Sequence, residues 1–75
     1  MPSSYSAKEI LKILKRAGFV IISQKGSHIK LRGIREGSIH TVIVPEHRTI
    51  AKGTFSSILK QAVMTKDEFE TYRKK

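Results

Sequence analysis

The stretch that most constrains the fold is "HIKLR", which begins at His28 and alternates polar and apolar residues with period two. Such alternation is typical of a β-strand with one face buried and the other in water. Ile29 and Leu31 should point to one face, and His28, Lys30 and Arg32 to the other. The turn signal "KGS" precedes this strand, and "GIREGS" follows it as a hairpin loop. The pattern predicts the middle strand of an antiparallel meander.

The two outer strands are predicted from runs of β-branched residues, "FVIISQ" before the middle strand and "IHTVIV" after it. Pro45 should end the third strand. The run "FVII" is apolar on both sides, so either Phe19 and Ile21 or Val20 and Ile22 must point away from the core. An exposed apolar strip of this kind invites a protein partner.

Helical spacing precedes the strands. "SAKE" predicts a capping box, in which the Ser6 hydroxyl accepts from the Glu9 N–H while the Glu9 carboxylate reaches back to Ser6. A helix should therefore begin at Ala7, and Gly18 supplies its stop. Its apolar face consists of Ile10, Leu11, Ile13, Leu14 and Ala17.

Helical spacing returns in "TFSSILKQAV", and "TKDE" repeats the capping box with Thr65 and Glu68 at the start of a short last helix. Thr54 either caps the second helix or helps its N-terminus to hold a phosphate. The predicted order is helix, three strands, helix and short helix. This is an α+β fold in one domain over residues 1–75, with the long helices on one face of the sheet.

Charge and size restrict the function. Fifteen Lys and Arg against six Asp and Glu give a net charge of +9, which indicates a polyanionic partner, with nucleic acid the leading candidate. A chain of 75 residues can enclose little, so an open surface acting on a polymer is expected. The absence of cysteine excludes a disulfide framework and a thiolate zinc site. No stretch resembles a membrane helix or signal peptide, so we expect a soluble cytoplasmic protein.

His28 is the best-placed candidate for chemistry, because imidazole titrates near neutrality and can exchange a proton with a ribose 2′-hydroxyl. It follows a Gly-Ser pair, where a tight turn can present backbone N–H groups to a phosphate oxygen. The alternative is that His28 is an exposed strand residue without a role. The candidate phosphate-binding residues around it are Lys25, Gly26, Ser27, Lys30 and Arg32.

The other histidines are weaker candidates. His40 lies within a strand, where a structural hydrogen bond is the ordinary explanation. His47 lies in a loop beside Arg48 and could contact phosphate or serve as a second proton-transfer group. The three histidines lack the spacing and the neighbouring carboxylates of a metal site, so we expect neither metal nor cofactor. Two interpretations are possible for the basic side chains of the first helix, a solvated face or a binding surface. These side chains are Lys8, Lys12, Lys15 and Arg16.

Three stretches in order, "ILKILKRAGFVIISQKGSHIKL", "VIVPEH" and "GTFSSILKQA", closely resemble the HicA-type mRNA interferase toxins of prokaryotic toxin-antitoxin modules. The resemblance spans almost the whole chain. The second-helix signature of that family falls on Gly53, Thr54, Ile58 and Leu59. The chain departs from the pattern at Lys52, where a proline is frequent, and at Val63 and Met64, where Ala-Gly is usual.

The resemblance implies a fold like a double-stranded-RNA-binding domain and a metal-independent endoribonuclease activity on mRNA. The Gly-Ser-His turn of the family falls on Gly26, Ser27 and His28, so the resemblance makes His28 the catalytic residue. It also implies a HicB-type antitoxin as protein partner. The rival interpretation is a non-catalytic RNA-binding module of the same fold. DNA binding is weaker, because no helix-turn-helix is present.

Overall fold

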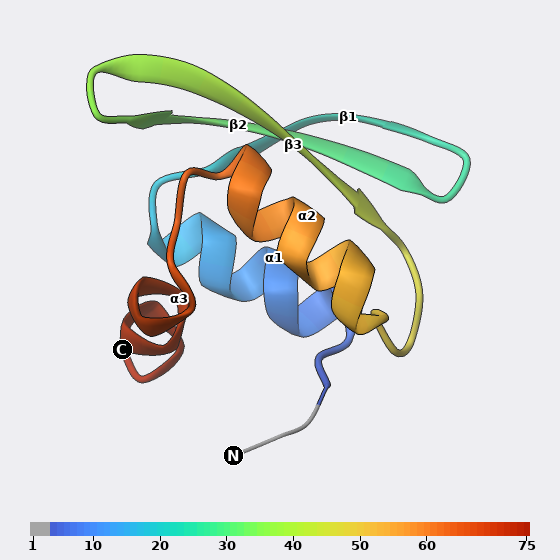
Figure 1. The fold of residues 1–75 in the computed structure, drawn as a ribbon. Coiled ribbons are helices and arrows are strands. Elements are labelled where there is room, and N and C mark those ends of the chain that lie inside the picture. The colour runs from blue at the N-terminus through green and yellow to red at the C-terminus, as the bar shows by residue number, and fades with distance from the viewer. Residues whose placement is uncertain (1–3) are drawn as a thin grey trace.

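The computed structural model describes residues 4–75. It contains a three-stranded sheet, and Figure 1 shows the helices on one side of this sheet. This arrangement confirms the predicted α+β class and the predicted order of elements. The elements are α1 (Ala7–Arg16), β1 (Val20–Lys25), β2 (His28–Arg35), β3 (Ser38–Pro45), α2 (Lys52–Gln61) and α3 (Lys66–Arg73).

The sheet is the predicted antiparallel meander, with strand order β1-β2-β3. The prediction that "GIREGS" is loop throughout is wrong, because β2 continues through Gly33 and Arg35. The turn is confined to Glu36 and Gly37, whose φ angles are 52° and 79°. Two residues with positive φ form a type I′ turn, whose twist matches that of the flanking strands. Ile34 therefore continues the alternation of β2.

The capping boxes predicted at Ser6 and Thr65 are both present, and α1 begins at Ala7 as expected. Thr54 does not cap α2, however. The cap is Ala51, which is extended and has no capping side chain, and the Phe55 N–H donates to the Ala51 carbonyl at 2.9 Å. Helical geometry starts early enough to place Thr54 inside the first turn.

The core lies between the sheet and the helices. Ile29 and Leu31 of β2 are buried, as the alternation predicted. Three aromatic rings pack against one another in or beside this core, with centroids 5.0 to 5.2 Å apart. These rings belong to Tyr5, Phe55 and Phe69.

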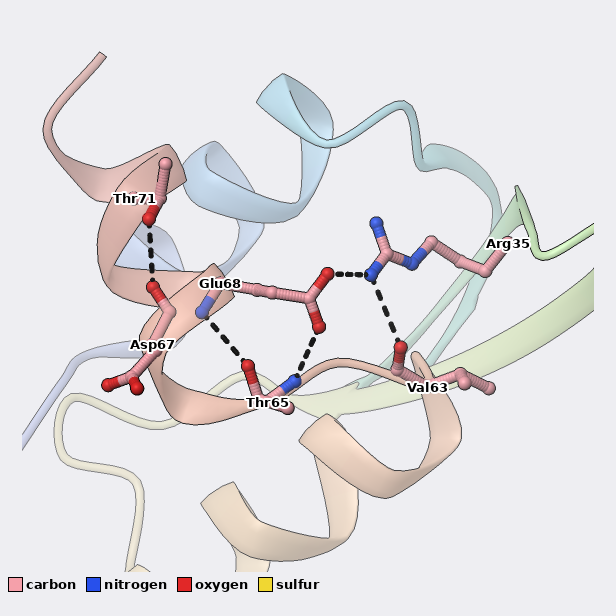
Figure 2. Close-up of polar contacts among 6 residues, drawn as sticks. All are labelled: Arg35, Val63, Thr65, Asp67, Glu68 and Thr71. Carbon is pink, nitrogen blue, oxygen red and sulfur yellow. Dashed lines mark hydrogen bonds and ion pairs between the residues drawn. The ribbon is translucent and has the colours of Figure 1, made fainter.

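Arg35 ties the sheet to the connection between α2 and α3 (Figure 2). Its Nη2 donates to Glu68 Oε2 at 2.6 Å and to the Val63 carbonyl at 3.3 Å. The other Glu68 oxygen accepts from the Thr65 N–H in the capping box. Arg16 similarly donates from α1 to backbone carbonyls at the end of α3. Both arginines are therefore engaged in holding α3 in place.

Candidate active site and basic face

The turn before His28 is tight. The β1–β2 ladder ends at the pair Lys25↔His28, so Gly26 and Ser27 are the two turn residues. Gly26 has φ of +59°, and no other position of this turn has a positive φ, which is the type II′ pattern that favours glycine at the first central position. The two turn residues lie outside the ladder, and His28 is the exposed first residue of β2.

Away from the helices the sheet presents what we call the open face. Residues paired directly across a sheet point to the same side, so the register assigns them to one face or the other. The buried residues Ile29 and Leu31 define the helix side, and the alternate residues of β2 point away from it, as predicted. The open face comprises Val20, Ser23, Lys25, His28, Lys30, Arg32, Ile34, Ile39, Thr41, Ile43 and Pro45.

A shallow hollow on the open face contains His28 together with two lysines. We call it the basic hollow, and it is lined by Ser23, Lys25, His28, Lys30 and Ile43. Within residues 4–75 neither lysine forms a salt bridge. Arg32 lies further along β2, where its Nε donates to Thr41 Oγ1 at 3.4 Å. The lysine charges beside His28 are thus unneutralised by carboxylates of the described chain.

His28 also borders a second hollow, between the end of β3 and the start of α2. His47, Thr54 and Ser57 contribute polar side chains to it, and Pro45 forms part of its wall. The structure therefore brings His47 to the same hollow as His28. Arg48 does not line it; it lines a separate depression with residues of α1, which His47 and Glu46 also border.

His40 lies opposite Gly33 on the helix side of the sheet and is half-buried. The hydrogen bond expected for its side chain is not found among residues 4–75. In that same part of the chain, no three His, Asp or Glu side chains gather as a possible metal site. None of the described helices has the length and apolar character needed to cross a membrane.

Two residues that the sequence did not single out contact the turn before His28. Gln24 Nε2 donates to the Gly26 carbonyl at 3.1 Å and to Glu46 Oε1 at 3.2 Å. The Glu46 backbone N–H donates to the Ser27 carbonyl at 2.6 Å. We call Gln24 and Glu46 the turn brace. Its members lie 22 positions apart, and no local pattern could have paired them.

The other end of the open face is apolar. Val20, Ile34 and Ile39 are 60%, 71% and 69% exposed, and we call them the apolar patch. They settle only the first half of the ambiguity of "FVII": Val20 points away from the helices, whereas Phe19 is buried. Neither predicted pair holds as a whole, because Ile21 pairs with the buried Leu31 yet is 43% exposed, and Ile22 is 41% exposed. A register shift between Ile21 and Ser23 interrupts the strand after that.

The sequence matches one protein-family model, described as the HicA toxin of bacterial toxin-antitoxin systems, over residues 7–64. The match spans more than half of the chain. It includes the turn, His28 and the residues that line the basic hollow and the second hollow. No curated protein matches the sequence.

Proposed function

We propose that this chain, which belongs to the HicA toxin family of bacterial toxin-antitoxin modules, is an endoribonuclease. It cleaves mRNA, and His28 is its catalytic residue. One observation carries the proposal. His28 is exposed on the open face, directly after a tight Gly-Ser turn, in the same hollow as two lysines that form no salt bridge with the described residues 4–75. A proton-transfer group and positive charge therefore meet on a surface that a polymer can reach.

The reaction that suits these groups is attack of a ribose 2′-hydroxyl on the adjacent phosphodiester. The 2′-oxygen bonds to phosphorus, and the bond from phosphorus to the 5′-oxygen of the next nucleotide breaks. His28 takes the proton from the 2′-hydroxyl or gives one to the leaving 5′-oxygen. The second proton transfer falls to water, to His47 across the second hollow, or to a lysine.

Charge builds up on the phosphate oxygens as the reaction proceeds. The N–H groups of Gly26 and Ser27 lie at a turn outside the strand ladder, where they can donate to such an oxygen. Lys25 and Lys30 supply positive charge from the strands on either side of the turn. Arg32 extends the positive face along β2. It would contact a phosphate of the RNA backbone at some distance from the bond that is cleaved.

Cleavage of RNA in EDTA by the wild-type protein and by His28→Ala tests the proposal. The wild type should release products with 2′,3′-cyclic phosphate and 5′-hydroxyl ends, and His28→Ala should release none. Because His28 is exposed, the substitution should change the free energy of unfolding by less than about 0.5 kcal/mol.

His40→Ala is the matched control, since that histidine lies on the helix side of the sheet. It should retain cleavage. Full cleavage by His28→Ala would remove the catalytic assignment, and RNA binding without cleavage by the wild type would favour the non-catalytic RNA-binding module.

The partner of a toxin in such a module is an antitoxin, and we propose an acidic, HicB-type protein that covers the open face. The apolar patch lies next to Arg32, so this surface offers apolar contacts beside positive charge. A second copy of this chain would bring a further charge of +9 against the same surface, whereas an acidic partner would be attracted to it.

Competition binding tests this occlusion. A non-cleavable 2′-O-methyl RNA and the purified antitoxin should exclude each other from His28→Ala. Simultaneous binding without mutual weakening would show that inhibition takes another route.

A further inference from the structure

We infer that Gln24 and Glu46 are positioning residues that fix the turn in front of His28. The inference rests on the proposed function and adds to it two residues that do not touch the substrate. Neither residue has a proton-transfer role here. Their hydrogen bonds to the turn carbonyls are the observation from which the argument starts.

The side chain of His28 depends on its backbone for its position. Within the described residues 4–75, no hydrogen bond holds its imidazole. Its neighbour across the sheet is Pro45, which has no N–H to donate to the ladder. The turn on one side and the end of β3 on the other are therefore the two places where the site could loosen.

The turn brace acts at both places. Gln24 holds the carbonyl of Gly26, and the backbone of Glu46 holds the carbonyl of Ser27. Because Gln24 also donates to the Glu46 carboxylate, the end of β1, the turn and the segment after β3 form one connected network. The two carbonyls of the turn are thus both fixed.

Fixing these carbonyls also aims the N–H group that follows each of them. The peptide unit is planar, with its carbonyl and the following N–H pointing in opposite directions. Gln24 therefore sets the direction of the Ser27 N–H through the Gly26 carbonyl, and Glu46 sets that of the His28 N–H. The Ser27 N–H is one of the two donors proposed to meet the phosphate.

The chemistry of the turn brace also leaves the basic hollow positive. The Glu46 carboxylate accepts from a neutral amide, and within residues 4–75 the only salt bridges join Arg35 to Glu68 and Arg73 to Glu70. A lysine in place of Gln24 could donate to the same carboxylate, but it lacks the planar amide group with which Gln24 donates to the Gly26 carbonyl and to Glu46. The observed pairing fixes the turn without drawing Lys25 to a carboxylate.

Gln24→Leu tests the inference, because leucine has a similar size and cannot donate either hydrogen bond. Single-turnover cleavage should slow by about 10- to 100-fold, the loss expected for a displaced catalytic group. Affinity for 2′-O-methyl RNA should stay at the wild-type value, since the lysines and Arg32 remain. Backbone amide exchange at Ser27 and His28 should become faster.

Two substitutions at Glu46 separate geometry from charge. Glu46→Gln keeps a side-chain oxygen that can accept from Gln24 and should cleave like the wild type. Glu46→Ala removes the acceptor and should slow cleavage. Thr71→Val is the matched control, because it removes a single side-chain hydrogen bond, to the Asp67 carbonyl within α3 (Figure 2). This helix lies on the opposite side of the molecule from the turn between β1 and β2 (Figure 1). The control variant should leave cleavage unchanged.

The outcomes distinguish this inference from the proposed function. Absence of cleavage by the wild type would overturn the proposed function and the inference with it. Cleavage by Gln24→Leu at the wild-type rate would overturn the inference alone. So would a loss of cleavage matched by an equal loss of RNA affinity, or a Glu46→Gln variant as slow as Glu46→Ala.

Discussion

Replacing Gly33 with alanine should destabilise the protein, because the ring of Phe19 occupies the space beside this glycine. A Cβ at position 33 would lie 2.6, 2.7 and 2.9 Å from three carbons of that ring. Favourable carbon contacts are about 3.5 to 4.0 Å, so the ring must move by about 1 Å. Phe19 is only 1% exposed, so its ring is enclosed by other residues and shifts only if they shift too. Overpacking of this kind costs about 1–3 kcal/mol.

For a domain of this size, that loss corresponds to a fall in Tm of about 5–20 °C, measurable by circular dichroism or calorimetry. Gly53→Ala is the control, since a Cβ there meets nothing within 4 Å and alanine favours the helix. The double variant Phe19→Leu, Gly33→Ala should be more stable than the sum of the single changes predicts. A Gly33→Ala protein as stable as the wild type would refute the steric argument.

Two further predictions concern charge. A helix-cap N–H lowers the pKa of Glu68 and the Tyr5 hydroxyl lowers that of Glu70, so their contribution to stability is complete above the ordinary pKa of 4.5 and is lost as the pH falls below it. Thermal unfolding should show Tm falling over that acid range, less steeply for Glu70→Gln, and an equal slope in the variant would contradict the assignment. RNA affinity should fall as the salt concentration rises, with a log-log slope of about −0.7 per phosphate contact. Joint removal of Lys25, Lys30 and Arg32 should reduce this slope more than removal of Lys8 and Lys12. The reverse order would move RNA binding to α1.

Much of the fold could be predicted because its signals are local. The alternation that begins at His28 lies within five consecutive residues, and each capping box spans four. The start of α2 lacks such a signal, because Ala51 caps it with no side chain. Thr54 was the nearest residue of a capping type, and this is why the predicted start was too late.

The surroundings of His28 show where local signals end. Its place after a Gly-Ser turn is a feature of neighbouring residues and could be found from the sequence. The turn brace depends on a contact between the end of β1 and the residue that follows β3, and these two strands are not adjacent in the sheet. Glutamine and glutamate are common surface residues, and neither one alone indicates a role.

The register of β2 and β3 connects the local sequence signals with the long-range contacts around His28, since it decides which residues lie beside His28. The turn at Glu36 and Gly37 pairs Arg35 with Ser38, and each step back along β2 then moves one step forward along β3 until His28 meets Pro45. A two-residue turn placed two residues earlier would pair His28 with Thr41 instead, and a loop spread over six residues would leave the pairing undefined. Recognition of the two-residue turn would therefore have placed the segment after Pro45 beside His28, and with it both Glu46 and His47. A slip of one residue would turn the side chains of one strand to the opposite face, so the same turn that ends β2 at one end of the sheet controls the site at the other.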